Sequence, residues 1–316
     1  MVKKIKKIKL KEKFKERIKN LLGNETENFF EYCNKKLDSY VRVNTLKISA
    51  QKVFERLNKK WQVFRPFPQE EIFLIKSKLG PGELGRTREH MLGYYYIQDI
   101  ASMMPVLALK PEPGETVLDL CAAPGGKVTM ISAKMKNSGL LIANDNNRKR
   151  NIVLCTNLGR CGCTNVIVTR EDAVFLCKKL EKIMQFDKIL LDVPCSGEGT
   201  IRPDTDIAKM WNIRMIERLS RQQKKMIASA IPCLKVNGTL VYSTCTLTPE
   251  ENEEVINFAL KNFDVELEKV ELPLKTRQGI KEWQGKKFFE EVKKCCRIYP
   301  QDNNSEGFFI AKLKKV

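Results

Sequence analysis

Two cysteines of this chain follow apolar runs, in positions where a thiol could act as a nucleophile. Cys195 comes shortly after an apolar run that ends at Asp192, and Cys245 comes directly after a second such run. A lone buried cysteine is usually an inert filler of the core. Two cysteines at neighbouring strand ends, beside Asp192 and within reach of Lys127, are a different case, because a nearby cation lowers the pKa of a thiol and favours the thiolate nucleophile.

A small turn with two glycines could hold a nucleotide-like ligand. It consists of Cys121, Ala122, Ala123, Pro124, Gly125, Gly126 and Lys127. Thr116–Leu120 before it resembles a buried strand, and apolar residues at helical spacing follow it. At the carboxyl end of a strand in a doubly wound sheet, such a turn is a ligand-binding position, although an ordinary tight turn is the alternative. This turn matches neither G-x-G-x-x-G nor G-x-x-x-x-G-K-[ST], which argues against a diphosphate ligand here.

Aspartates stand at the ends of further predicted strands. Asp145 follows the glycine turn at about the distance at which an acidic residue binds ribose hydroxyls in nucleotide-binding folds. Asp172 could accept a hydrogen bond from an exocyclic adenine amine. Each of these aspartates alone could equally cap a helix. Together with Asp192 they indicate a ligand site, because the carboxyl ends of parallel strands share one edge of the sheet.

The elements that must position these side chains alternate between strand and helix. The expected strands are 140–143, 166–168, 189–191 and 240–242, with 265–267 and 308–313 completing the sheet. Alternation of this kind predicts a parallel sheet covered on both faces. We expect a single helix over 87–109, and a helix capped by Thr248 with Pro249 in its first turn and Glu251 three residues after the cap.

The first part of the chain reads as a separate small module. A basic amphipathic helix is expected over 5–22, followed by strands at 40–46, 61–67 and 72–75. Ser49 is placed to cap a helix that runs to Leu57. No catalytic grouping occurs in this part, so we expect it to hold the substrate. The predicted domains are residues 1–85, a basic helix with a small α+β module, and residues 86–316, the larger α/β domain.

Composition limits the function further. The formal net charge of +19 predicts a polyanionic partner, above all nucleic acid, although a lysine-rich surface is also typical of heat-adapted proteins. RNA binding should then weaken as salt is added. No apolar run is long enough to span a membrane, and no secretory signal is recognised, so we expect a cytoplasmic protein with cysteines as free thiols. C-x-x-C pairs are absent and His90 is the only histidine, so no metal site is expected.

Several segments resemble the NOL/NOP/SUN-type RNA cytosine-5 methyltransferases. The resemblance covers roughly residues 40–313 and is carried by Gln98-Asp99 with Ala101-Ser102, by 119–127, 192–197, 242–246 and 249–253, and by 297–300 with 306–311. It implies a Rossmann-like class I methyltransferase sheet with helices on both faces, preceded by a small α+β, RNA-recognition-like module. It also implies S-adenosylmethionine as the cofactor and RNA as the partner. A histidine often found in the family is absent from 301–305 here.

The resemblance also implies a role for individual residues. The methionine and ribose portion of the cofactor would lie along Cys121–Lys127. Asp145 would hold the ribose, Asp172 would bind the adenine, and Asp192 would lie between cofactor and target base. Arg150 matches a basic residue that contacts the cofactor in the family.

The chemistry of the family explains why cysteines are needed. C5 of cytosine is a poor nucleophile until a thiolate adds at C6 and makes C5 an enamine carbon. In the family the cysteine matching Cys245 attacks, the aspartate matching Asp192 protonates or hydrogen-bonds N3, and the cysteine matching Cys195 assists product release. Asp192 should therefore have a raised pKa. The target base must be unpaired or flipped out of its helix.

We therefore predict an S-adenosylmethionine-dependent RNA cytosine-5 methyltransferase that acts on tRNA, similar in build to compact archaeal members of the family. One alternative is a ribosomal-RNA methyltransferase of the same family. Another is a noncatalytic RNA-binding or assembly protein on the same fold, although this chain retains Cys245 and the glycine pair. Nothing in the sequence identifies an accessory protein.

Overall fold

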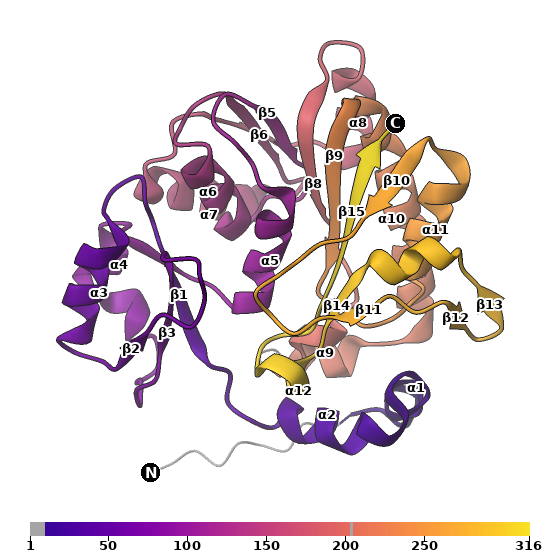
Figure 1. The fold of residues 1–316 in the computed structure, drawn as a ribbon, viewed down its shortest axis with the longest axis horizontal. Coiled ribbons are helices and arrows are strands. Elements are labelled where there is room, and N and C mark those ends of the chain that lie inside the picture. The colour runs from indigo at the N-terminus through magenta and orange to yellow at the C-terminus, as the bar shows by residue number, and fades with distance from the viewer. Residues whose placement is uncertain (1–9, 203–204) are drawn as a thin grey trace.

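The larger part of the chain is a nine-stranded sheet with helices on both faces (Figure 1). The computed structural model describes residues 10–202 and 205–316. The strand order is β11-β14-β15-β9-β8-β5-β6-β7, with β10 paired to β15. The strands are β5 Thr116–Asp119, β6 Leu140–Asn144, β7 Val166–Thr169, β8 Phe186–Asp192, β9 Leu234–Thr244, β10 Val265–Glu268, β11 Arg277–Gln278, β14 Cys296–Ile298 and β15 Phe308–Lys315. Strands β5 to β9 pair in parallel, as predicted, whereas β15 runs antiparallel to β9, β10 and β14.

Each face of this sheet is covered by its own layer of helices. One layer contains α5 Ile100–Leu109, α6 Gly126–Lys134 and α7 Arg148–Cys161, and the other contains α8 Ala173–Leu180, α10 Ile213–Ala230 and α11 Glu253–Asn262. Successive strand residues point to opposite layers, so Val117 packs in one apolar cluster and Leu118 in the other. Burial on both faces explains why the strands read as continuous apolar runs. The predicted Rossmann-like arrangement is confirmed.

A four-stranded antiparallel sheet forms the core of the small module. Its order is β2-β3-β1-β4, from β1 Ser39–Val43, β2 Val63–Phe64, β3 Ile72–Ile75 and β4 Tyr95–Ile97. The predicted helix after Ser49 is α3 Ala50–Asn58, and the Ser49 hydroxyl accepts a hydrogen bond from the Lys52 N–H. One strand of this sheet, β4, comes after residue 85, where the sequence analysis divided the chain into two domains. That division stays a prediction.

The expectation of a single helix over 87–109 is wrong. The segment contains α4 Arg88–Met91, then β4, then α5. Gly93 ends the first helix with φ +72°, and a Cβ there would lie 1.9 Å from the Arg160 carbonyl oxygen, so the chain must turn at a glycine. Asp99 then starts α5 by accepting a hydrogen bond from the Ala101 N–H.

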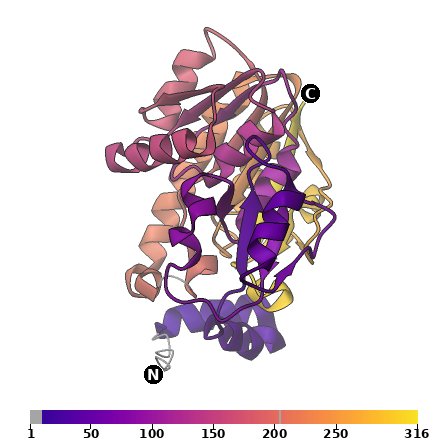
Figure 2. The same ribbon diagram turned by 90° about the vertical axis from the view of Figure 1, so that its left-hand side faces the viewer.

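The N-terminal helices pack against helices and loops at one end of the larger domain rather than on the small sheet. They are α1 Glu12–Leu22 and α2 Thr26–Cys33, and both views show them together at one end of the molecule (Figures 1 and 2). Phe14 meets Trp211 edge to face with ring centroids 5.3 Å apart, in an apolar cluster shared with α9 Thr205–Met210. The apolar side of α1 therefore lies against the larger domain, and residues 5–9 of the expected helix lie outside the described residues.

Two short elements complete the fold. They are the helix α12 Pro300–Asn303 and a hairpin of β12 Glu282–Trp283 with β13 Lys286–Lys287. Throughout residues 10–202 and 205–316, no helix combines the length and the apolar character needed to cross a membrane.

Candidate active site

The cysteine thiols meet at the carboxyl edge of the parallel strands. Strands β8 and β9 pair so that Asp192 lies opposite Ser243, and each chain leaves the sheet just beyond that point. As a result the Sγ atoms of Cys195 and Cys245 lie 3.2 Å apart. The hydrogen bond with Cys245 and burial together raise the pKa of the Cys195 thiol well above its usual range. The Cys195 thiol therefore keeps its proton.

The loops that carry the cysteines are held by buried hydrogen bonds. We call residues 193–199 and 245–252 the cysteine loops. The hydroxyls of Ser196 and Thr246 lie 2.7 Å apart and join the two loops. The Glu251 carboxylate accepts a hydrogen bond from the Ser196 N–H at 3.1 Å. Burial raises the pKa of Glu251 to about 7. The Gly199 N–H donates to the Cys245 carbonyl at 2.9 Å, which fixes the backbone of that cysteine.

These contacts overturn the predicted start of the helix after β9. Thr248 was expected as the cap, but α11 begins only at Glu253, after a turn over 249–252. The Thr248 hydroxyl instead accepts a hydrogen bond from Arg17 of α1. Glu251, expected to complete the cap, binds Ser196 instead. The side chains of Thr248 and Glu251 therefore form tertiary hydrogen bonds instead of a local capping box.

A charged pair lies between the cysteine loops and the glycine turn. Lys127 Nζ donates to Asp192 Oδ2 at 2.7 Å, and the Ser243 hydroxyl donates to Asp192 Oδ1 at 2.7 Å. Burial alone would lower the pKa of Lys127, but the charge of Asp192 and its hydrogen bond outweigh that effect and raise it. Lys127 therefore stays a cation and can deliver a proton or a hydrogen bond beside Asp192. Its ammonium group also lies 5.2 Å from the centre of the Phe308 ring.

The glycine turn has the geometry of a ligand seat. The Ala122 N–H donates to the Asn144 carbonyl at 2.8 Å, which ties the turn to the end of β6. Gly125 has φ +109°, a conformation that favours glycine, and Gly126 begins α6. Asp119 lies buried beneath the turn and accepts a hydrogen bond from the Cys121 N–H; burial, then the charge of Asp192, raises the pKa of Asp119 to about 7.

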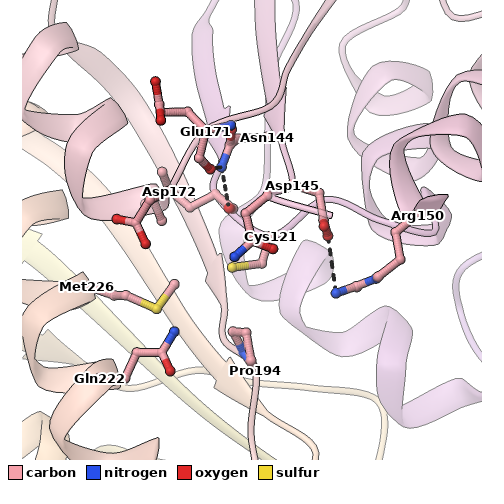
Figure 3. A pocket seen from close by; sticks show the side chains of 12 residues that line it. Cys121, Asn144, Asp145, Arg150, Glu171, Asp172, Pro194, Gln222 and Met226 are labelled. Carbon is pink, nitrogen blue, oxygen red and sulfur yellow. Dashed lines mark hydrogen bonds and ion pairs between the residues drawn. The ribbon is translucent and has the colours of Figure 1, made fainter. Parts of the chain in front are cut away.

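Asp145, Arg150 and Asp172 lie around one pocket (Figure 3). Asp145 is buried at the end of β6, and Arg150 Nη1 lies 3.2 Å from its Oδ2 atom. Arg150 also donates to the Ala123 carbonyl, so this exposed side chain joins the seat to Asp145. Asp172 caps α8 through the N–H groups of Val174 and Phe175, as the alternative interpretation expected, while still lining the pocket.

Two adjoining pockets match an elongated cofactor. Pocket A is lined by Cys121, Asn144, Asp145, Arg150, Asp172 and Pro194, among others. Pocket B, of about 340 Å³, is lined by Gln98, Asp99, Asp119, Cys121, Gly126, Lys127, Asp192 and Glu306, among others. Cys121 belongs to both, so a ligand laid along the turn would reach the buried carboxylate of Asp145 at one end and the Lys127–Asp192 pair at the other.

Arg42 is a site residue that the sequence analysis missed. It lies on β1 of the small sheet, almost fully buried at 2% exposure. Its guanidinium donates to Gln98 Oε1, to the Gly126 carbonyl and to the Thr129 hydroxyl, each at 2.7 Å. Burial lowers the pKa of Arg42 to about 10. The alternating pattern of the strand shows on which face Arg42 lies. No neighbouring residue in the sequence indicates that this face contacts the cofactor seat, which lies 84 residues away.

A parallel sheet that ends in a glycine turn, a buried acidic residue and adjoining pockets is typical of a fold that binds a nucleotide-like cofactor. Similar solved structures identify it as a class I, S-adenosylmethionine-dependent methyltransferase. Residues 106–314 match the family described as 16S rRNA methyltransferase RsmB/F, and residues 10–100 match the N-terminal domain of 16S rRNA methyltransferase RsmF. The chain therefore belongs to the RsmB/F (NOL1/NOP2/SUN) family of RNA cytosine-5 methyltransferases, whose cofactor is S-adenosylmethionine.

Relatives of two kinds are similar to this chain. The tRNA (cytosine(49)-C(5))-methyltransferase of Pyrococcus abyssi (strain GE5 / Orsay) is 41% identical over 308 residues, which cover 97% of each chain. Ribosomal RNA small subunit methyltransferase F of Psychromonas ingrahamii is 39% identical over 317 residues, which cover 98% of this chain but 64% of that relative.

Solved structures agree with this placement. A methyltransferase homologue from Pyrococcus horikoshii superposes with a TM-score of 0.86 at 37% identity, covering 99% of this chain and 98% of that one. NSun6 from Pyrococcus horikoshii, solved with the S-adenosylmethionine analogue SFG, gives 0.82 at 26% identity, covering 97% and 98%.

Proposed function

We propose that this enzyme methylates C5 of a cytosine in tRNA through a covalent bond between Cys245 and C6 of the base. The observation that carries the proposal is the pair of thiols 3.2 Å apart, next to a lysine–aspartate pair at the end of the cofactor seat. tRNA is favoured because the relative that matches this chain over 97% of both lengths is named for tRNA.

The residues of the seat are proposed to hold the cofactor in an extended form. Asp145 would accept hydrogen bonds from the ribose hydroxyls, because its carboxylate is buried at the wall of pocket A. Asp172 would accept from the adenine amine, and Cys121–Lys127 would lie along the methionine portion. When bound there, S-adenosylmethionine supplies an electrophilic methyl group.

Cys245 is proposed to begin the reaction as a thiolate. Its electron pair forms the bond to C6, and the C5–C6 π electrons move so that C5 becomes nucleophilic. Negative charge that develops toward N3 is met by a proton or hydrogen bond from the Lys127–Asp192 pair. After C5 has gained the methyl group, its original proton passes to water, and the C–H electron pair re-forms the C5–C6 double bond. The C6–S electron pair leaves with sulfur as the Cys245 thiolate, and a proton taken up at N3 returns to the Lys127–Asp192 pair.

Cys195 is proposed to assist that last step. Its raised pKa leaves it as a thiol beside the Cys245 sulfur, where it can donate a hydrogen bond to the departing thiolate. A leaving group that is stabilised in this way departs faster.

Paired cysteine variants test the mechanism. Cys245→Ala should abolish methyl transfer to tRNA, because the neighbouring Cys195 keeps its proton and a thiol is a poor nucleophile. Cys195→Ala should accumulate a protein–RNA adduct that survives denaturing electrophoresis, with little released product. Full methylation by Cys245→Ala, measured with a labelled methyl donor, would overturn the covalent mechanism.

A ribosomal-RNA substrate is the second candidate, because relatives such as that of Psychromonas ingrahamii carry that name. Incubation of the enzyme and cofactor with purified tRNA and with small-subunit ribosomal RNA, followed by mapping of 5-methylcytosine, separates the two. Methylation confined to ribosomal RNA would refute tRNA as the substrate while leaving the reaction intact.

A further inference from the structure

Two carboxyl side chains that the proposed reaction does not use lie together in the wall of pocket B. Asp99 is the cap of α5, and Glu306 precedes β15 near the other end of the chain. The Glu306 N–H donates to Asp99 Oδ1 at 3.3 Å. The same pocket is lined by Lys127 and Asp192, so this carboxyl pair faces the space in which the proposed chemistry occurs.

The carboxyl pair also lies where pocket B adjoins another pocket. A second, wider hollow, pocket C, is lined by Lys35, Lys36, Tyr40 and Arg202, among others. Pockets B and C share Ile97, Gln98, Asp99 and Glu306. A nucleotide that enters past the cations of pocket C therefore meets Asp99 and Glu306 before it reaches Asp192.

Asp99 retains an unused acceptor. Its Oδ1 atom accepts from the N–H groups of Ala101 and Glu306. Its Oδ2 atom is buried and has no hydrogen-bond partner among residues 10–202 and 205–316. A buried oxygen without a partner costs free energy unless a ligand supplies a donor.

The charge of the Asp99–Glu306 pair suits a ligand with an uncharged hydrogen-bond donor. Burial raises the pKa of Asp99 to about 6, and burial followed by the charge of Asp99 raises that of Glu306 to about 8. Between these values the pair holds one proton and one negative charge. It therefore presents a strong acceptor to whatever fills the pocket.

Cytosine and uracil differ in what they would offer to such an acceptor. Cytosine carries an amine at position 4, whereas uracil carries a carbonyl oxygen there. Position 4 adjoins both N3, which the proposed mechanism directs to the Lys127–Asp192 pair, and the reacting C5. The carbonyl oxygen of uracil would face the carboxyl pair without a hydrogen atom to donate. A buried site that accepts a hydrogen bond from its substrate rejects a base that has no donor there.

We propose that Asp99 and Glu306 accept hydrogen bonds from the N4 amine of the target cytosine and so exclude uracil from the site. This assignment rests on the proposed function and names the residues that make the enzyme specific for cytosine. They contact the base but take no part in the bond changes.

The test compares two RNAs that differ only in the amine. One is a tRNA carrying the cytosine that the wild-type enzyme methylates, and the other has a pyrimidin-2-one nucleoside at that position, with hydrogen in place of the amine. Asp99→Asn and Glu306→Gln should each lower kcat/KM for the cytosine RNA by about tenfold or more. For the pyrimidin-2-one RNA, kcat/KM of each variant should differ from that of the wild type by less than about twofold. This base has no amine, so the substitution removes no hydrogen bond to it.

Controls separate this role from general damage. Asn is itself a good helix cap, so Asp99→Asn should leave α5 in place. Glu306 caps no helix, so Glu306→Gln should fold normally. This variant decides the test if Asp99→Asn fails to fold. Asp187→Asn, at the opposite end of β8, should change neither RNA's kcat/KM.

The outcomes that overturn the assignment are distinct. Equal losses on both RNAs would refute recognition of the amine, and so would weaker binding of S-adenosylhomocysteine, which would place the carboxyl pair on the cofactor. A wild-type enzyme that methylates no RNA cytosine would instead refute the proposed function, and the assignment with it.

Discussion

The cofactor seat and the cysteine loops lie at the same edge of one sheet, yet they are held in different ways. The seat is a run of consecutive residues, Cys121–Lys127, tied to β6 by backbone hydrogen bonds, with the exposed Arg150 beside it. The cysteine loops are held by buried contacts between segments far apart in sequence, such as Ser196 with Thr246 and Gly199 with Gly307. The first region is one continuous segment that borders two pockets, whereas the second joins segments far apart in sequence.

The difference follows from what each region is proposed to do. A cofactor must enter and leave in every catalytic cycle, which a turn that borders two pockets allows. A nucleophile must be held within a fraction of an ångström of its target, which requires loops whose side chains are fixed by packing and hydrogen bonds. We therefore expect substitutions in the loops to reduce stability and rate together, and substitutions in the seat to reduce cofactor affinity.

The sharpest test of this contrast is Gly199→Ala. A Cβ at this position would lie 2.1 Å from the Gly307 carbonyl oxygen, so the strand or the loop must move. We expect a loss of about 3 kcal/mol in the free energy of unfolding and at least about tenfold in kcat, with unchanged affinity for S-adenosylhomocysteine. Urea unfolding, a methylation assay and calorimetric titration measure these three quantities. Gly159→Ala is the control, since nothing lies within 4 Å of its Cβ, and it should stabilise α7 by ~0.5–1 kcal/mol.

A second test concerns the seat. Asp145→Ala should raise the Kd for S-adenosylhomocysteine by about ten- to a hundredfold, because a buried carboxylate that binds ribose is lost. The free energy of unfolding should change less than it does in Gly199→Ala. Arg150→Ala should raise the Kd by only about threefold, since the Arg150 side chain is exposed. Equal effects of the two substitutions in calorimetric titration would contradict the proposed role of Asp145.

The smallest expected effect is on the pH dependence of stability and comes from Asp119, which lies beneath the seat and senses the charge of Asp192. Its folded-state pKa of about 7 exceeds the unfolded value of about 3.9, so the folded chain binds a proton that the unfolded chain releases between these pH values. Stability attributable to Asp119 should therefore fall as pH rises from about 4 to about 7. Asp119→Asn should remove this loss and be ~1–2 kcal/mol more stable than the wild type at pH 8, with little difference near pH 4.

A carboxyl group with the opposite shift provides the control. Burial alone would raise the pKa of Asp187, but hydrogen bonds from Lys235 and the Thr116 N–H outweigh burial and lower it. Its stabilising effect is present above the unfolded pKa and is lost on acidification, so Asp187→Asn should be destabilising at pH 8. If urea unfolding at pH 8 showed both asparagine variants shifted in the same direction, the pKa assignment for Asp119 would be wrong.

The same contrast explains what the sequence could predict. The strand ends at Asn144, Asp192 and Thr244 and the Ser49 cap were predictable, because apolar runs and capping residues act locally. The meeting of Cys195 with Cys245 followed from the rule that parallel strands open on one edge. The roles assigned to these residues stay predictions.

Features that depend on distant partners were not predictable. The segment 87–109 breaks at Gly93 because that residue packs against the carbonyl of Arg160 on another helix. Thr248 resembled a helix cap, but an arginine from α1 binds it. The carboxyl pair of Asp99 and Glu306 joins residues that no local pattern links. In each case tertiary contacts overrode a local preference.

Arg42 has a consequence for how a target is chosen. Its guanidinium binds the Gly126 carbonyl and Thr129, and Tyr40 and Leu74 of the same sheet share an apolar core with α5. The small sheet therefore cannot swing independently of the seat. We expect an RNA held by that sheet to present its nucleotides at a fixed distance from Cys245, so that this distance selects the nucleotide to be modified.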